Sequence, residues 1–334
     1  MCLPSPKSQE SAGNEKDVPL ADDPQQVEVF SFFALGENPQ IENIAIGVFD
    51  GLHLGHQKIL ERLLSLGTAE NCLVLSFDPH PLAVISPEQA PPSLLSLSQK
   101  KNLLHLYGIK HILFVQFDQR LRQLRAELFL ITLKKIFPRL RAVVVGEDFR
   151  FGLNAEGNVA FLKERGRNLR VQTVVVPPLI RYGEPISSTR IRKAIVQRNF
   201  WLASELLGRS YKIEGYVAAG RGAGKEIGFP TANLEGIAQL LPPPGVYGCQ
   251  VEYKNEFFFG VANYGRRPTV QDGGELVLEV HLLNFSGDLY GEKLSLFNFQ
   301  FLREEKKFLS LPELKSQIEK DIQKAKEFFM PKFF

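Results

Sequence analysis

The stretch at residues 44–60 reads IAIGVFDGLHLGHQKIL, and it decides the fold of the first half of the chain. Its apolar run ends abruptly at Asp50, and beyond the two histidines the spacing of apolar residues becomes helical, so the pattern predicts a strand, a tight turn and a helix start. A helix N-terminus offers unpaired N–H groups and a partial positive charge, which suits an anion. His53 and His56 stand at this junction, and Gly55 lets a ligand approach the backbone closely. The stretch therefore predicts a phosphate site.

The composition sets wide bounds on the rest of the protein. A length of 334 residues allows two domains, and a hydrophobic content of 44% allows sizeable cores. The net charge of +3 is small and scattered, so neither nucleic acid nor an anionic membrane is indicated, and no obligatory protein partner is implied. No apolar run approaches the ~20 residues that span a bilayer. Cys2, Cys72 and Cys249 form no CxxC pair and the N-terminus lacks a secretory signal, so we expect a cytoplasmic protein without a disulfide framework or structural zinc.

The first domain is expected at residues 27–200, after a polar tail at residues 1–26 that is predicted to be disordered. Short continuous apolar runs alternate with helical patterns, which predicts a Rossmann-like α/β domain with a parallel, doubly wound sheet. Ligands bind such sheets beyond the carboxyl ends of the strands. Strands are predicted at residues 44–49, 72–77, 109–117, 142–145 and 171–176, and helices at residues 57–66, 98–107, 121–136 and 159–165.

The second domain is expected at residues 210–330, after short helices at about residues 188–198 and 200–207 and a linker at residues 201–209. Strands spaced near ten residues apart without intervening helices predict a small antiparallel β-barrel. They are expected at residues 211–217, 245–253, 256–264, 275–283 and 292–301. Residues 311–328 carry apolar residues at helical spacing among many Lys and Glu, which predicts an amphipathic C-terminal helix.

Three further polar segments accompany the predicted α/β domain. They read FDPHP at residues 77–81, GEDFRFG at residues 146–152 and ISSTRIR at residues 186–192. By themselves they are typical of a Pro-rich turn, a strand exit and a capped helix. The last segment begins its helix with basic residues, against the usual dipole preference for acids, and a bound polyphosphate would resolve that conflict.

A glycine-rich loop opens the predicted barrel, with GRGAGKEIG at residues 220–228 followed by FPTANL. Four glycines in nine residues can bring backbone N–H groups around a polyphosphate, although a flexible linker is the plainer interpretation of such a loop alone. Thr231 and Asn233 offer neutral oxygens to a Mg²⁺–nucleotide complex.

These motifs together resemble a known family. The string GxFDGxHxGH at residues 47–56 resembles the FAD synthetases of the nucleotidyltransferase superfamily, and the three polar segments match its FxPHP, GxDFRFG and ISSTxIR motifs in order. The run GFPTANL at residues 228–234 resembles the riboflavin kinase signature, as do PGVY at 244–247, GVANYGRRPT at 260–269, LEVHLL at 278–283 and GDLYG at 287–291. From about residue 27 to residue 328 the chain is similar to the bacterial bifunctional riboflavin kinases/FAD synthetases.

The resemblance implies two reactions with small-molecule partners: ATP phosphorylates riboflavin to FMN, and a second ATP adenylylates FMN to FAD and releases pyrophosphate. It implies that Glu279 is the kinase base and that His53 and His56 stabilise charge during adenylyl transfer. The residues implied for ATP and FMN in the adenylyltransferase are Gly47, Phe49, Asp50, Gly55, Asp78, Pro79, His80, Asp148, Phe149, Arg150, Ser188, Thr189 and Arg192. Those implied for ATP and flavin in the kinase are Gly222, Gly224, Lys225, Gly228, Phe229, Pro230, Thr231 and Asn233, with Thr231 and Asn233 also on Mg²⁺.

The sequence departs from the family pattern at three places. Lys225 stands where the family usually has Arg, Asn158 replaces a common acid, and Tyr264 stands where Ile is usual. Lys225 keeps the charge but loses the bidentate fork, which bears on ATP affinity. Two alternatives stay open: that only one module is active, and that the chain is a flavin-binding protein without enzymatic activity.

Overall fold

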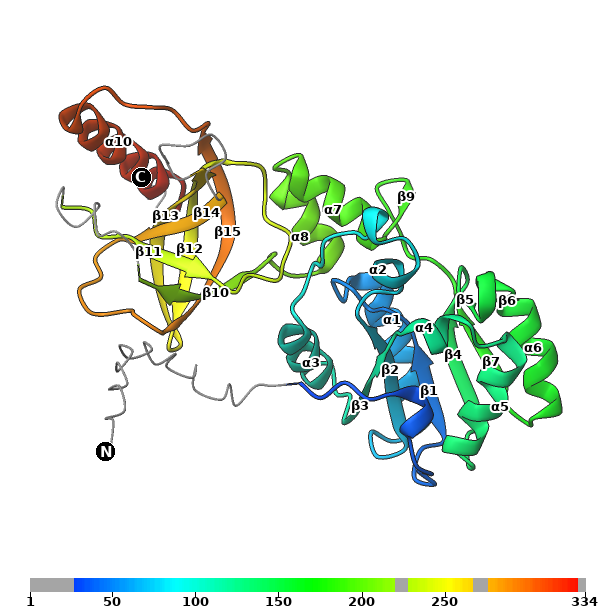
Figure 1. Ribbon diagram of the computed structural model, residues 1–334. Helices are drawn as coiled ribbons and strands as arrows, with labels where there is room; N and C mark the ends of the chain where they lie inside the picture. Colours follow the sequence, from blue (N-terminus) through cyan, green and yellow to red (C-terminus); the bar gives the residue numbers. More distant parts are fainter. Residues whose placement is uncertain (1–26, 220–227, 267–275, 330–334) are drawn as a thin grey trace, which may run out of the picture.

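The computed structural model describes residues 27–219, 228–266 and 276–329. The predicted disordered tail, the loop residues Gly222, Gly224 and Lys225, and part of the GVANYGRRPT run lie outside the described residues. In Figure 1 an α/β domain lies beside a barrel, and α7 and α8 lie between them. This arrangement confirms the predicted fold class of a parallel α/β sheet followed by an antiparallel barrel and a C-terminal helix.

The α/β domain is built on a five-stranded parallel sheet in the order β3-β2-β1-β4-β7. The strand order reverses at β1, so the crevice between the carboxyl ends of β1 and β4 is where this architecture binds ligands. The strands are β1 (Asn43–Ile46), β2 (Cys72–Asp78), β3 (His111–Gln116), β4 (Ala142–Gly146) and β7 (Gln172–Val176).

Each face of the sheet has its own core, because successive strand residues point to opposite sides. Ile44 and Ile46 pack with helices α5 (Ala126–Ile136) and α6 (Val159–Asn168), whereas Ala45 packs with α1 (Leu54–Leu64) and α3 (Leu97–Leu106). The smaller elements are α2 (Pro81–Ile85), α4 (Gln119–Arg122), the 3-10 turns Phe32–Ala34, Pro87–Gln89 and Leu153–Ala155, and the two-residue pairs β5 (Arg150–Phe151) with β6 (Gly157–Asn158) and β8 (Ile180–Arg181) with β9 (Glu184–Pro185).

The predicted helix at residues 121–136 is divided into α4 and α5. The carboxylate of Glu156 accepts the backbone N–H of Ala126 at 2.8 Å and pairs with Arg125, so it caps a new helix start in the middle of the predicted one. The predicted strand at residues 44–49 is also too long: β1 ends at Ile46, and the residues after it form the turn described below.

The barrel closes in the order β10-β11-β14-β13-β12-β15. Its strands are β10 (Ile213–Ala218), β11 (Ala232–Glu235), β12 (Gly245–Tyr253), β13 (Glu256–Arg266), β14 (Leu276–Leu282) and β15 (Lys293–Arg303). The predicted strands agree to within two residues at each end, but β11, which overlaps the end of the GFPTANL run, was not predicted. Helix α10 (Leu311–Phe329) packs on the barrel, with Ala325 against Gly248 and the ring of Phe329 stacked on Phe259 at 5.4 Å between centroids.

Helices α7 (Ser188–Val196) and α8 (Phe200–Leu207) belong to the same hydrophobic core as the barrel interior. That core also includes Leu94 from the α/β domain. Helix α8 forms at the residues where a short helix was predicted, and the linker expected at residues 201–209 overlaps it. Where the two domains divide stays a prediction.

Candidate active site

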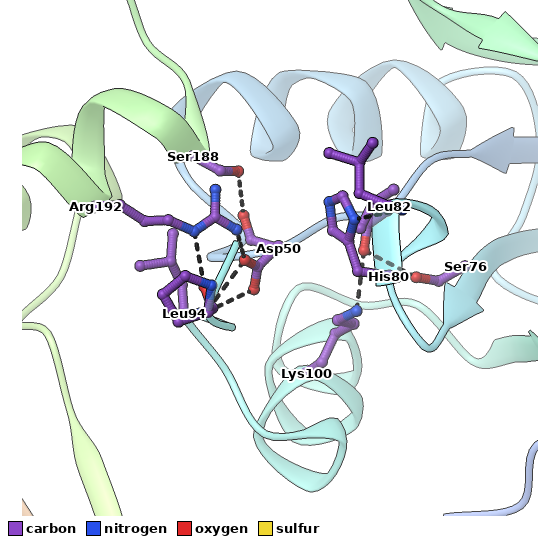
Figure 2. Close-up of polar contacts among 10 residues, drawn as sticks. Asp50, Ser76, His80, Leu82, Leu94, Lys100, Ser188 and Arg192 are labelled. Carbon is purple, nitrogen blue, oxygen red and sulfur yellow. Dashed lines mark hydrogen bonds and ion pairs between the residues drawn. The ribbon is translucent and has the colours of Figure 1, made fainter. Parts of the chain in front are cut away.

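The turn between β1 and α1 has an unusual backbone. Phe49, Gly51 and Leu52 have φ values of 52°, 82° and 39°, in the left-handed region that Phe and Leu rarely adopt. The carbonyl oxygen of Val48 accepts two hydrogen bonds, from Ser76 Oγ and Lys100 Nζ, each at 3.0 Å (Figure 2). Side chains from β2 and α3 thus hold the turn in a shape that the chain would not adopt by itself.

This turn places His53 at the N-cap of α1. Its Nδ1 accepts the backbone N–H of His56 at 3.2 Å, which satisfies one of the unpaired donors of the helix start. The rings of His53 and His56 stack with their centroids 3.6 Å apart, and Phe49 meets the His56 ring edge-on at 5.3 Å. A Cβ at Gly55 would lie 3.1 Å from the His53 ring, so glycine here makes room for the imidazole.

Both imidazoles are neutral at pH 7. Burial lowers the pKa of His53 to about 4, with a further contribution from the charge of Arg209. Burial also lowers the pKa of His56 well below its usual value, and His53 and Lys100 act in the same direction. Because His53 Nδ1 is the acceptor for His56, its proton is on Nε2, and the ring presents an N–H donor at the helix start. The Nδ1 atom of His56 is buried without a hydrogen-bond partner among the described residues.

Asp50 joins this turn to α7 and to the segment before α3. Its carboxylate accepts the backbone N–H of Leu94 at 3.0 and 3.1 Å and forms an ion pair with Arg192 (Figure 2). Its carbonyl oxygen accepts Ser188 Oγ at 2.7 Å, and Arg192 Nε donates to the carbonyl of Pro92 at 2.8 Å. The structure therefore brings Asp50, Ser188 and Arg192 together, as predicted site residues, from sequence positions far apart.

Protein groups contact two of the basic residues at the start of α7. Asp50 balances Arg192, and Arg190 pairs with Glu184 at 3.1 Å while donating to the carbonyls of Arg181 and Glu184. Protein groups thus offset part of this basic charge, and the binding of a polyphosphate at the helix start stays a prediction.

Asp78 and His80 line a small cavity beside this turn. His80 caps α2 by accepting the backbone N–H of Leu82 at 3.1 Å, and burial lowers its pKa. The lining also includes Lys100, which sequence reasoning missed. The full lining is Val48, Asp50, Phe77, Asp78, His80, Ser93, Leu95, Leu97 and Lys100. The predicted Pro79 is exposed, between two residues that face the cavity.

The predicted residues after β4 lie on the other side of the sheet. Phe149 stacks on Phe151 at 5.4 Å and packs with the core under α5 and α6, whereas Phe49 packs with the core under α1 and α3. Asp148 and Arg150 are exposed, as is Thr189 on α7. The Asp148 carboxylate lies close to the Gly146 backbone, since a Cβ at Gly146 would be 3.1 Å from its Oδ1. The Gly47 backbone passes close to the Phe49 ring, since a Cβ at Gly47 would lie 3.2 Å from the ring carbons.

Arg209 is a second residue that sequence reasoning missed. Its guanidinium donates to the carbonyls of Gly51 at 2.7 Å and Leu52 at 3.1 Å, immediately before His53. Burial lowers its pKa. A signal was present in the sequence, since an arginine directly after a predicted helix end is well placed to bond carbonyl groups, but it gave no hint of which carbonyls.

The barrel places its predicted residues on neighbouring strands. Glu279 on β14 lies in register with Asn233 on β11 and with Asn263 on β13. Asn233 is buried, Glu279 is half-buried, and Thr231 is exposed just before β11. Thr231 and Asn233 are two residues apart, so the alternation of an extended strand brings them to the face that carries Glu279.

His281 fixes the segment that leads into β11. Its Nδ1 donates to the carbonyl oxygen of Pro230 at 2.8 Å, and its ring meets that of Phe229 edge-on at 5.6 Å. Gly228 has a φ of 86°, which suits glycine at the entry to this segment. The GFPTAN run is thus tied to the strand that carries Glu279.

Comparison with known proteins identifies the family. A model of FAD synthetase matches residues 36–190, and a model of riboflavin kinase matches residues 207–329. A protein of Escherichia coli (strain K12) named bifunctional riboflavin kinase/FMN adenylyltransferase is 39% identical over 289 residues, which are 86% of this chain and 92% of that protein. The chain belongs to the bifunctional riboflavin kinase/FMN adenylyltransferase family.

A second relative and a solved structure are also similar over most of the chain. A protein of the same name from Buchnera aphidicola subsp. Schizaphis graminum is 35% identical over 291 residues, which are 86% of this chain and 93% of that protein. A crystal structure titled as a macrolide-efflux protein from Streptococcus pneumoniae is similar with a TM-score of 0.76 and 27% identity, covering 89% of this chain and 97% of that one. Among the described residues, no helix has both the length and the apolar character that crossing a membrane requires.

Membership in the bifunctional riboflavin kinase/FMN adenylyltransferase family confirms the family resemblance and the two transferase activities predicted from the sequence. Flavins are the substrates and products of this family, together with ATP. The roles of individual residues and the magnesium requirement stay predictions.

Proposed function

We propose that the two reactions of this family, phosphorylation of riboflavin to FMN and adenylylation of FMN to FAD, occur at two separate sites of this chain. One site is the turn that carries His53 and His56, and the other is the face of the barrel that carries Glu279. The observation that carries the proposal is the neutral His53, whose Nε2–H donor stands at a buried helix start beyond β1, where this sheet order reverses.

At the first site, an oxygen of the FMN phosphate attacks the α-phosphorus of ATP. A new P–O bond forms, the bond from the α-phosphorus to the bridging oxygen breaks, and pyrophosphate leaves with that electron pair. No protein nucleophile is needed. His53 donates a hydrogen bond to the phosphate charge that develops, and the N–H groups at the start of α1 act in the same direction. His56 supports the stacked His53 ring.

The remaining predicted residues of that site divide into two groups by their contacts. Asp50, Ser188 and Arg192 hold the turn, α7 and the segment before α3 together, which fixes where His53 points. Arg192 can also offer charge to ATP, because only part of its guanidinium is used by Asp50 and Pro92. Gly47, Phe49 and Gly55 shape the turn, while Asp78, Pro79 and His80 form one wall. We assign Asp148, Phe149 and Arg150 to flavin binding, from the segment that follows β4.

At the second site, Glu279 orients the terminal ribityl hydroxyl of riboflavin and accepts its proton. The hydroxyl oxygen attacks the γ-phosphorus of the other ATP, the bond to the bridging oxygen breaks, and ADP leaves. Phosphoryl transfer depends mainly on positioning and on charge neutralisation. Asn233 pairs in register with Glu279 on the adjacent strand. The sheet therefore fixes the distance between the proposed base and the amide that we assign to the phosphates.

Magnesium fits the donor set of the barrel site. Thr231 and Asn233 carry neutral oxygens, and Mg²⁺ prefers oxygen ligands shared with nucleotide phosphates. When bound, the ion would neutralise charge on the phosphates of ATP. Gly228, Phe229 and Pro230 lie next to these residues, and Gly222, Gly224 and Lys225 complete the predicted loop outside the described residues.

We further propose that these reactions take place in the cytoplasm with small molecules as the only obligatory partners. Cys72 and Cys249 are both free and buried, which is compatible with a reducing compartment.

The test is incubation of the purified protein with riboflavin, ATP and Mg²⁺, followed by chromatography of the flavins. FMN and FAD together support the proposal. A single product would leave one active module, and unchanged riboflavin that still binds would indicate a flavin-binding protein. Chelation of magnesium should stop both products.

A further inference from the structure

Lys100 is a buried cation that no step above uses. It lies on α3 with only 6% of its surface exposed. Burial lowers the pKa of its ammonium group, and the carboxylates of Asp50 and Asp78 oppose that shift. Lysine is rarely buried to this extent unless it is paired or has a function.

The hydrogen bond from Lys100 to Val48 accounts for only part of its donor capacity. An ammonium group has three N–H donors, and the carbonyl of Val48 accepts one of them. That carbonyl is also held by Ser76 Oγ at the same distance of 3.0 Å. The turn therefore has a second anchor, so holding Val48 is an incomplete explanation for a buried charge.

Lys100 lines the small cavity beside the His53 turn. His80 and Asp50 line the same cavity as Lys100, and Figure 2 shows the three side chains in one view. The Asp50 carboxylate already accepts from Leu94 and pairs with Arg192, so it is not reserved for the lysine. Lys100 also lowers the pKa of both His56 and His80, which places its charge within electrostatic reach of the histidines on both sides. A cation so placed attracts an anionic oxygen.

We propose that Lys100 is a further substrate-binding residue of the adenylyl-transfer site, whose ammonium group contacts a phosphate oxygen of ATP or of FMN. The inference rests on the proposed function of this site. Both candidate sources share one chemistry, a phosphate oxygen with negative charge, and Lys100 binds it as a point charge rather than as a fork.

The chain provides a matched control, because Lys101 is the next residue on α3 and is exposed. K100M should lower kcat/KM for FAD formation by about 10- to 10²-fold through weaker binding of one phosphate substrate, the usual effect of losing a hydrogen bond to a charged group. Riboflavin phosphorylation by the same molecules should be unchanged, and K101M should leave both activities unchanged. S76A, which removes the other bond to Val48, should change FAD formation by less than about tenfold.

Two binding measurements identify the phosphate. If Lys100 meets ATP, K100M raises KM for ATP and weakens inhibition by pyrophosphate, while the affinity for FMN, read from flavin fluorescence, stays at the wild-type value. If Lys100 meets FMN, the FMN affinity falls and KM for ATP is unchanged. Either pattern supports the proposal.

Three outcomes overturn the proposal. The first is wild-type FAD formation by K100M, and the second is a loss of FAD formation in S76A as large as that in K100M. The third is a lowered kcat of K100M with both substrate affinities intact. Loss of kinase activity in K100M as well would mean that this variant fails to fold. The test then uses K100R. A changed affinity of K100R for one phosphate substrate supports the proposal, and unchanged affinities reject it. A wild-type protein that makes no FAD rejects the proposed function instead.

Discussion

Asp50 and Arg192 form a buried ion pair between residues 142 positions apart in the chain. Their side chains are 7% and 12% exposed, so neither charge is well solvated. The pair links the turn after β1 to α7, and the same Asp50 carboxylate holds the backbone of Leu94. Three segments of the adenylyl-transfer site thus depend on one carboxylate.

The single variants D50N and R192M should each destabilise the protein by about 3–5 kcal/mol, because each leaves a buried charge without its partner. The double variant should be less destabilised than the sum of the two. Urea denaturation of all four proteins gives this coupling as a double-mutant cycle. Additive losses would show that the two charges do not depend on one another.

H53N should lose FAD formation by about 10²–10³-fold and keep FMN formation. Asparagine is a good N-cap, so α1 keeps its cap while the site loses its Nε2–H donor. Chromatography of products from riboflavin and from FMN separates the two activities. H105N, at an exposed histidine of α3, serves as the control and should behave as wild type. Equal damage to both activities in H53N would contradict the two-site assignment.

E279Q should lose riboflavin phosphorylation by about 10²–10⁴-fold, since glutamine keeps the shape of the side chain but accepts no proton. FAD formation from supplied FMN should stay at the wild-type rate. E235Q is the matched control, because Glu235 is an exposed carboxylate on the neighbouring strand β11. FMN formation by E279Q at the wild-type rate would remove Glu279 from the proposed mechanism.

Stability should fall as the pH drops from about 6.5 to about 4, and His53 should account for part of the fall. The pKa of His53 is about 4 in the folded protein and 6.5 when it is unperturbed. Above pH 6.5 both states are neutral. Between the two values the unfolded state binds a proton that the folded state does not, which favours unfolding by up to about 3 kcal/mol below pH 4.

Urea denaturation followed by circular dichroism at pH 7 and pH 4.5 measures this effect in wild type and in H53N. The stability lost between the two pH values should be smaller in H53N, because asparagine does not titrate. The same loss in both proteins would mean that His53 is already exposed to water in the folded state.

The sequence alone was sufficient for elements whose pattern is local. The strand β12 and the helix α8 begin and end where they were predicted, because glycine or asparagine stands at or within two residues of each of their ends. The β1 strand was overextended because the residues at 47–49 are as apolar as a strand, while the contacts of Val48 with Ser76 and Lys100 that bend the chain are not local.

The site was predictable as far as its motifs extend. His53, Asp50 and Arg192 follow from the motifs, yet the ion pair between the last two does not, since it depends on how α7 packs. Lys100 was missed although the sequence held a signal: it lies three residues after Leu97 and four before Leu104, on the apolar stripe of α3. A lysine on such a stripe indicates a buried ammonium group. Glu279 needed the family, because a half-buried strand glutamate has no chemical signature of its own.

The hydrophobic core shared by α7, α8 and the barrel bears on whether the two activities can be separated. The FAD synthetase match ends at residue 190 and the riboflavin kinase match begins at residue 207, so most of both helices, within residues 191–206, falls between the two models. They carry Ser188 and Arg192 for one site and bury their apolar faces in the other domain. Expressing either half alone would leave an incomplete adenylyl-transfer site or an exposed apolar surface. The shared core therefore gives a physical reason for the two enzymes to be inherited as one polypeptide.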